Sequence, residues 1–176
     1  MEFRIRKATV DDAEAIAIVH VESWRSTYEG IVPEAFIGSL SVQERTERWK
    51  EAFAAGDSSI FVAEDGLSIF GFASGGKLRA NKDGSILEGY DGELYAIYLL
   101  HDRQRRGAGR HLVHALAEAL LTNGFKSLAV WVLKENPSVA FYQRLGGTQV
   151  AESTIEIGGV RLAELAFGWP ALDACL

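Results

Sequence analysis

Cysteine and long hydrophobic runs are scarce in this 176-residue sequence. Cys175 is the only cysteine, which excludes an intramolecular disulfide and a zinc site built on cysteines, and we expect no metal site. No apolar run approaches the roughly 18 residues that a membrane-spanning helix needs. The opening residues, MEFRIRKATVDD, lack the apolar core of a signal peptide. We therefore expect a cytoplasmic protein that does not enter membranes.

Positive charge is also in short supply. The chain has 18 lysines and arginines against 24 acidic residues, a net charge of −6. This balance argues against nucleic-acid binding, which needs a basic surface. A local basic pocket for an anionic small ligand is still compatible with it, and the overall field favours a cationic partner.

The rest of the composition is that of an ordinary globular protein. Hydrophobic residues make up 48% of the chain and charged residues 24%. We find no internal repeat, low-complexity tract or linker. At this length we expect residues 1–176 to form a single domain.

Hydrophobic periodicity predicts an α/β fold with a central mixed sheet and helices on both of its faces. A strand, a helix and a strand over residues 93–133 indicate a parallel pair with a helical crossover, whereas the early and late hairpins indicate antiparallel pairs. The expected strands are 3–8, 59–64, 67–74, 93–100, 127–133 and the two that flank Gly158-Gly159, and the expected helices are 9–30, 33–40, 41–55, 107–123 and 136–145.

Local signals place the helix ends and the core. Ser41-x-x-Glu44 has the pattern of a capping box, Gly124 that of a C-terminal cap, and Asn136-Pro137 predicts an N-cap followed by a first-turn proline. The strand 93–100 is nearly continuous in apolar residues and is expected to be buried on both faces. Trp49 and Trp131 are expected in the core.

The most informative segment is the loop after strand 93–100. It has two glycines, Gly107 and Gly109, and a helix follows at once. The first N–H groups of a helix have no internal partner and lie at the positive end of the helix dipole. A glycine-containing turn that leads into a helix can therefore bind a phosphate or pyrophosphate. Neither a P-loop nor a dinucleotide fingerprint is present. Four arginines add charge-assisted hydrogen bonds: Arg103, Arg105, Arg106 and Arg110.

Two motifs carry a resemblance to a known family. Gln104-Arg105-Arg106-Gly107-Ala108-Gly109 resembles the Q/R-x-x-G-x-G/A coenzyme A loop of the GNAT superfamily of N-acetyltransferases. The segment 136–146 is similar to the family's N-P-x-x-x-F-Y-x-x-x-G-F motif, and the likeness is firmest over 59–150. Two departures are His101, where many members have proline, and Gly147, where phenylalanine is usual.

The resemblance implies an enzyme that moves an acetyl group from acetyl-CoA to a primary amine of a small molecule or peptide. The amine would attack directly in a ternary complex, with Tyr142 as general acid and Glu93 as base through water. Glu88, Asp91 and His20 are alternative bases. The alternative function is a non-catalytic acyl-CoA sensor or interaction module on the same fold. The resemblance is also compatible with a homodimer.

The resemblance further implies which residues hold the cofactor. The backbone of Ile97, Tyr98 and Leu99 would bind the pantetheine arm and polarise the thioester. The pyrophosphate and the remaining cofactor contacts would fall to Gln104, Arg105, Arg106, Gly107, Ala108, Gly109, Arg110, Asn136 and Ser138.

The acceptor site is expected near the first helices. Trp24 and Tyr28 are four residues apart and share one helix face, where they either bind an apolar or cationic acceptor or form a core pair. The loop 80–92, with Asp83 and Asp91, would border this site. Cys175 lies too far along the chain to serve as an acyl-enzyme nucleophile.

Overall fold

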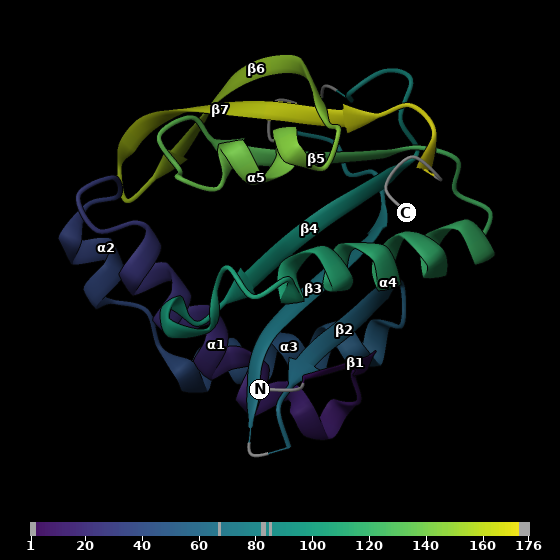
Figure 1. Cartoon of the computed structure of the whole chain (residues 1–176). Coiled ribbons are helices and arrows are strands. Elements are labelled where there is room, and N and C mark those ends of the chain that lie inside the picture. Colours follow the sequence, from purple (N-terminus) through teal and green to yellow (C-terminus); the bar gives the residue numbers. More distant parts are fainter. Residues whose placement is uncertain (1–2, 67, 82–83, 85, 173–176) are drawn as a thin grey trace.

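A seven-stranded mixed sheet forms the centre of the computed structural model, which describes residues 3–66, 68–81, 84 and 86–172 (Figure 1). The strands follow the order β1-β2-β3-β4-β5-β7-β6, and every neighbouring pair is antiparallel except β4 with β5. The predicted mixed sheet is confirmed. Its strands are β1 (Arg4–Lys7), β2 (Ser58–Glu64), β3 (Ile69–Lys77), β4 (Gly92–Leu99), β5 (Leu128–Leu133), β6 (Thr148–Ile157) and β7 (Val160–Trp169).

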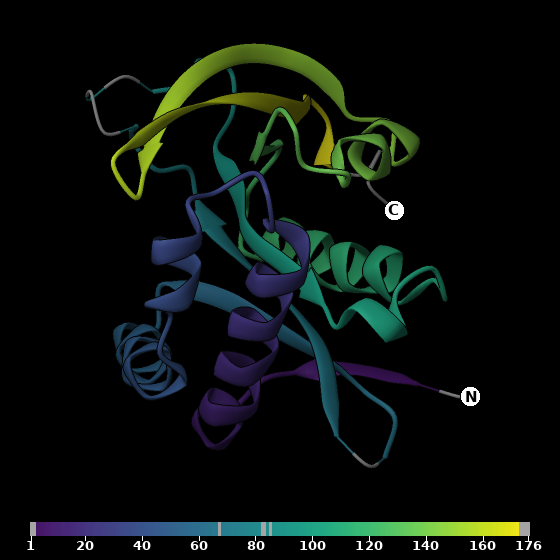
Figure 2. The same cartoon turned by 90° about the vertical axis from the view of Figure 1, so that its left-hand side faces the viewer.

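Helices cover both faces of this sheet, as Figure 2 shows. One face is covered by α4, whose Leu112, Leu116 and Leu120 are completely buried. The other face is covered by α1 and α3, with Ile16 and Trp49 packed over β2 and β3. No helix in the described part of the chain is long and apolar enough to cross a membrane. The helices are α1 (Ala13–Thr27), α2 (Glu34–Gly38), α3 (Val42–Ala55), α4 (Ala108–Thr122) and α5 (Val139–Arg144).

The helix ends largely follow the sequence signals. The Ser41 hydroxyl accepts the Glu44 N–H at 3.3 Å and caps α3. Gly56 ends this helix with φ +68°, a conformation that glycine adopts without strain. Gly124 has φ +89° directly after α4, which confirms the predicted C-terminal cap.

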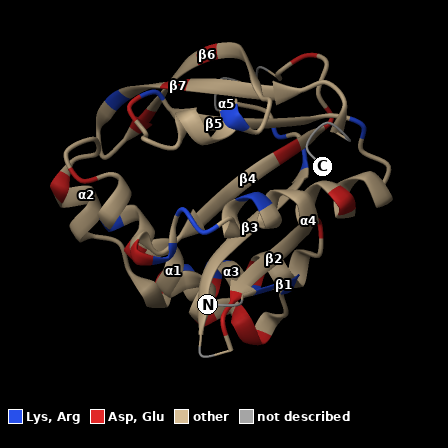
Figure 3. Ribbon diagram, in the orientation of Figure 1, with Lys and Arg blue, Asp and Glu red and all other residues tan. Residues whose placement is uncertain are grey.

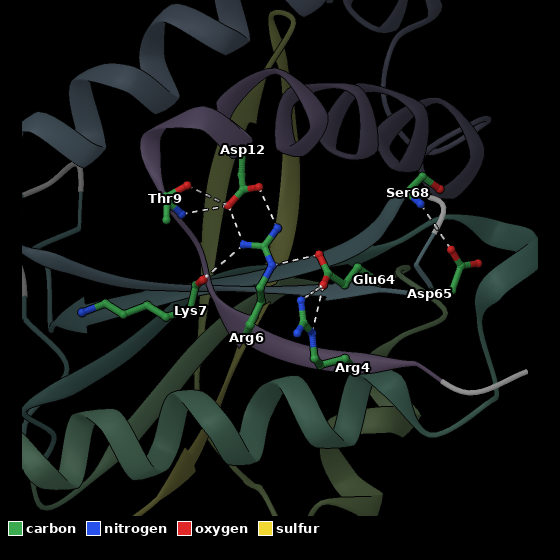
Figure 4. A network of polar contacts seen from close by, with 8 residues as sticks. All are labelled: Arg4, Arg6, Lys7, Thr9, Asp12, Glu64, Asp65 and Ser68. Atoms are coloured by element: carbon green, nitrogen blue, oxygen red, sulfur yellow. Dashed lines mark hydrogen bonds and ion pairs between the residues drawn. The ribbon is translucent and has the colours of Figure 1, made fainter.

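A polar network ties the first strand to its surroundings (Figure 4). Arg6 donates to both oxygens of Asp12 at 2.7 and 2.8 Å and to Glu64 on β2 at 2.8 Å. Arg4 pairs with the same Glu64. The hydrogen bonds from Arg6 lower the pKa of Asp12, although partial burial opposes the shift. The network fixes where the chain leaves β1 for α1.

The predicted start of the last helix is wrong. Helix α5 begins at Val139, with Ser138 as its N-cap, rather than at Pro137. The reason is the side chain of Asn136, whose Oδ1 accepts the Ser138 N–H at 2.8 Å. This bond to the backbone two residues on closes a turn ahead of the helix.

Two predictions of burial also need correction. Only Gly92–Leu94 of β4 are buried, and Tyr95–Leu99 are partly exposed. The cause is that β4 pairs with β5 at Gly92 and Glu93 alone, so the rest of β4 lacks a neighbour on that side. Trp131 is only partly buried for a related reason, because it lies on β5 beside this divergence. Trp49 is 8% exposed and belongs to the core as predicted.

Alanine at Gly75 is expected to destabilise the fold by about 1–3 kcal/mol. Its Cβ would lie 2.5 Å from the backbone oxygen of Glu93 and 2.9 Å from Leu116 Cδ2, so β3 and β4 would have to move apart. Gly38→Ala is the matched control, because a Cβ there meets nothing within 4 Å. Urea denaturation of both variants measures the difference, and equal stabilities would contradict this close approach.

Candidate active site

The divergence of β4 from β5 creates the central feature of the site. Figure 1 shows β4 running away from β5 after their short parallel contact. Ile97, Tyr98 and Leu99 still pair with β3 on one side, but within the described residues no strand pairs with them on the other. Backbone groups along such an open strand edge can bind an extended ligand as an added strand would. The three residues thus lie where the sequence places them.

A basic loop stands at the end of this open edge, between β4 and α4. Gly107 has φ +87° and directly precedes α4, while Arg105 has φ +60°, the only positive φ of a described non-glycine residue. A left-handed arginine costs about 1–2 kcal/mol, and such strain is concentrated at functional sites. Gln104 Nε2 donates to the Leu99 oxygen at 3.1 Å and anchors the loop to β4.

The loop is exposed and positively charged. Arg105, Arg106 and Arg110 are all exposed, and Figure 3 colours the stretch leading into α4 mainly for lysine and arginine. The first N–H groups of α4 open toward the same place. Arg103 points elsewhere, since it pairs with Asp65 in the β2–β3 turn. The loop can therefore bind a doubly charged anion with three guanidinium groups and a helix N-terminus.

Close packing joins this loop to α5. A Cβ at Gly109 would lie 3.4 Å from both Leu99 Cδ1 and the Phe141 ring. Ala108 beside it is 1% exposed and packs in the core. These two positions shape the loop rather than offering side-chain donors.

Tyr142 projects from α5 into a buried position. It is 6% exposed, and its ring stacks on Phe167 with a centroid distance of 6.2 Å. Burial raises the pKa of Tyr142, and the nearby Tyr28 raises it further. The hydroxyl is therefore protonated at neutral pH and can donate a proton or a hydrogen bond.

A hydrogen-bonded chain links α5 to the other helices. Asn136 Nδ2 donates to the Tyr28 hydroxyl at 3.1 Å, and this hydroxyl lies 3.3 Å from that of Tyr98. Asn136 is 6% exposed, so its amide is occupied on one side by Tyr28 and on the other by Ser138. Asn136 and Ser138 lie just before α5, the helix that carries Tyr142, and the sequence gives no sign of the bond from Asn136 to Tyr28.

Glu93 lies at the closed end of the divergence, where β4 still pairs with β5. Its side chain is 6% exposed and accepts three hydrogen bonds from Arg79: from the backbone N–H at 2.9 Å, Nε at 3.2 Å and Nη2 at 2.6 Å. The Arg79 guanidinium also lies 3.9 Å from the centroid of the Tyr95 ring. Sequence reasoning misses this partner, because Arg79 stands 14 residues away in an irregular stretch.

The other carboxylates and His20 differ in their surroundings. Asp91 accepts hydrogen bonds from the N–H groups of Lys126 and Ser127 and from the Ser127 hydroxyl. Partial burial would raise the pKa of Asp91, but these hydrogen bonds outweigh it and lower the pKa. Burial, aided by the charge of Arg45, lowers the pKa of His20 to about 3. Glu88 is exposed. Asp83 and Cys175 lie outside the described residues.

Aromatic side chains line the α1 side of the divergence. The rings of Trp24 and Tyr28 lie 4.6 Å apart, and Phe36 on α2 is 5.9 Å from Trp24. The β6–β7 hairpin closes on α2, since a Cβ at Gly158 would come within 2.9 Å of Phe36 Cβ. Tyr28 is 6% exposed and Trp24 partly exposed. The predicted pair exists and borders the open edge of β4.

The described residues contain no group of three or more side chains of the kind that binds a metal ion. The acid–base groups described near the divergence are tyrosines, carboxylates and one histidine.

Comparison with known proteins finds similar chains along nearly the whole sequence. Residues 70–155 match the family model described as FR47-like protein. The chain is 50% identical over 171 residues to YuaI of Bacillus subtilis, described as an uncharacterized N-acetyltransferase, and the match covers 97% of this chain and 94% of that protein.

Two solved structures illustrate the likeness in fold. PaiA N-acetyltransferase from Thermoplasma acidophilum, in complex with coenzyme A, has a TM-score of 0.71 at 22% identity and covers 93% of this chain and 98% of its own. YncA from Salmonella typhimurium, described as a putative acetyltransferase with its cofactor acetyl-CoA, has a TM-score of 0.69 at 21% identity. The match covers 97% of this chain and 94% of YncA. At these identities the likeness concerns the fold.

Proposed function

The chain belongs to the GNAT superfamily of N-acetyltransferases, and from this premise we propose that it transfers an acetyl group from acetyl-CoA to a primary amine by direct attack. The observation that carries the proposal is the basic loop at the N-terminus of α4, placed at the end of an unpaired segment of β4. This combination suits a ligand with a diphosphate at one end and an extended amide-containing arm.

The residues of the loop fit such a ligand by charge and shape. Arg105, Arg106 and Arg110 would neutralise the phosphates, and the first N–H groups of α4 would bind their oxygens. The free edge at Ile97–Leu99 would receive the amides of the pantetheine arm as an added strand. A backbone N–H of this edge would then stabilise the charge that develops on the thioester oxygen.

Tyr142 is assigned as the general acid. The amine nitrogen forms a bond to the thioester carbon, the carbon–sulfur bond breaks, and Tyr142 gives its proton to the departing sulfur. Its raised pKa keeps this proton in place until that step. The nitrogen of the new amide loses its remaining extra proton through water, and the tyrosinate regains a proton in exchange. We assign no acyl-enzyme intermediate.

The amine must also lose a proton, because an alkyl ammonium with a pKa of about 10.4 has no free lone pair at pH 7. Glu93 is assigned as the base that takes this proton through water. Arg79 fixes the orientation of its carboxylate. His20 is buried and neutral and therefore suits this role less well.

Reversing charge in the loop tests the cofactor assignment. The double substitution Arg106→Glu, Gly107→Ala is expected to weaken acetyl-CoA binding about 100-fold, because it places a carboxylate beside the phosphates and a Cβ at φ +87°. Titration calorimetry measures the change. Arg48→Glu, which reverses an exposed charge on α3, is the control and should leave the affinity unchanged.

Unaltered affinity in the folded double variant would contradict the assignment of the loop. Acetyl-CoA binding without transfer to any amine would instead favour a non-catalytic acyl-CoA sensor on the same fold.

A further inference from the structure

Arg45 on α3 occupies an unusual place for an arginine. It lies four residues before Trp49, on the same face of the helix. The Trp49 ring packs 6.0 Å from His20 of α1 and 5.1 Å from Phe72 of β3. Arg45 therefore sits one turn nearer the start of α3, on the face turned toward α1 and the sheet, and is partly buried.

Arg45 has no partner there. Three arginines in the described part of the chain are partly buried: Arg6 pairs with Asp12 and Glu64, Arg103 pairs with Asp65, and only the guanidinium of Arg45 forms no hydrogen bond or ion pair. A buried, unpaired cation costs free energy. Burial accordingly lowers the pKa of Arg45, and the neighbouring Arg48 lowers it further. An anionic ligand would offset this cost.

An unpartnered polar atom lies on the facing side of α1. His20 Nδ1 is buried and has no hydrogen-bond partner among the described residues, whereas the Trp24 side chain interacts with that of Tyr98. His20 is 9% exposed, and its ring stacks on Tyr98 with centroids 5.1 Å apart. Buried polar groups are nearly always satisfied in folded proteins, so this nitrogen calls for a partner that the chain itself does not supply.

These groups adjoin the reacting end of the proposed site. Tyr98 belongs to the open edge of β4, and its hydroxyl contacts that of Tyr28. Arg45 and His20 lie on the α1 side of the sheet, whereas the basic loop opens α4, the helix on the other face. An anion at Arg45 is thus held apart from the phosphates of a bound cofactor, on the side left for the acceptor.

We propose that the amine acceptor carries an anionic group, such as the carboxylate of an amino acid, and that Arg45 binds this group. The guanidinium matches a carboxylate by two parallel hydrogen bonds. This inference deepens the proposed function and rests on it.

Paired acceptors test the proposal. Several L-amino acids are compared with their own carboxamides, and O-phosphoethanolamine with ethanolamine, by following thiol release from acetyl-CoA. We expect kcat/KM to be at least about 10-fold higher for the anionic member of a pair. The two kinds of pair separate a carboxylate from a phosphate as the preferred group.

Variants of Arg45 link that preference to the side chain. Arg45→Gln should lower kcat/KM for the anionic acceptors about 100-fold and for the neutral ones less than about 3-fold, whereas Arg48→Gln should change neither. Arg45→Lys keeps the positive charge but cannot form two parallel hydrogen bonds to a carboxylate, so it should lower kcat/KM for the anionic acceptors by an intermediate amount. If Arg45→Gln does not fold, the proposal is tested by Arg45→Lys and by the preference of the wild-type enzyme for anionic acceptors.

Three results would overturn the inference while the proposed function stands. The first is equal rates for acids and amides, and the second is an equal loss for both in Arg45→Gln. The third is acetylation of neutral amines with no reaction of any anionic acceptor. Absence of acetyl-CoA binding would instead defeat the proposed function itself, and the inference with it.

Discussion

Replacement of Tyr142 by phenylalanine is expected to lower kcat about 100- to 1000-fold and to leave the Kd of acetyl-CoA unchanged. General acid catalysis contributes on this scale, and the variant loses only the hydroxyl. The ring keeps its stacking on Phe167, so the fold is preserved. Thiol release with a reactive amine gives kcat, and calorimetry gives Kd. Tyr90→Phe is the control for loss of a tyrosine hydroxyl elsewhere.

The pH profile adds a second readout for Tyr142. Burial raises the pKa of this hydroxyl above its usual value of 10, so the acid stays protonated and the wild-type rate should not fall as the pH rises through 10. The Phe variant should remain slow over the same pH range. A Phe variant with the wild-type kcat at every pH would show that Tyr142 is a packing residue and not the acid.

Replacement of Glu93 by glutamine is expected to lower kcat about 100-fold at neutral pH. The amide cannot take the proton that the amine must lose, yet it can still accept a hydrogen bond from Arg79. Acetyl-CoA affinity should stay unchanged, because Glu93 lies at the far end of β4 from the basic loop. Glu118→Gln, an exposed substitution on α4, is the isosteric control.

The rate dependence on pH distinguishes the two roles open to Glu93. A base gives kcat/KM an acidic limb that the glutamine variant lacks. A carboxylate that only holds Arg79 leaves the pH profile unchanged and affects thermal stability instead. A loss of less than about 3-fold, with a lowered Tm, would contradict the assignment as base.

Sequence reasoning succeeds where the signal is local. The N-cap at Ser41 and the left-handed glycine at Gly124 depend on a few neighbouring residues, and both are present in the structure. The loop Gln104–Arg110 is recognised for the same reason, because its glycines, arginines and following helix are contiguous. Periodicity likewise predicts the mixed sheet, since strands and helices bury different patterns of residues.

It fails where a long-range contact decides. The apolar sequence of β4 indicates burial on both faces, but β5 turns away after Glu93 and leaves the strand partly exposed. No local sequence signal indicates where β4 and β5 diverge. Asn136 is a comparable case on a smaller scale, because its choice between capping a helix and closing a turn depends on where α5 packs.

Charged partners are the least predictable part of the candidate site. Arg103 belongs by sequence to the cluster of basic residues, yet its pairing with Asp65 removes it from the loop. Arg79 and Glu93 are paired although they stand 14 residues apart in the sequence. Arg45 stands out only once the structure shows that it is partly buried without a partner. Ion pairs between separate elements have no fixed sequence spacing, so these contacts become visible only in the three-dimensional structure.

Calorimetric titration of the wild-type protein with acetyl-CoA, and with dephospho-CoA as the control, tests the central claim most directly. The account predicts micromolar binding of acetyl-CoA, about −8 kcal/mol at a Kd of 1 μM, and weaker binding of the control, which lacks one phosphate. No binding at millimolar acetyl-CoA would contradict it, because the basic loop and the open edge of β4 would then serve no cofactor.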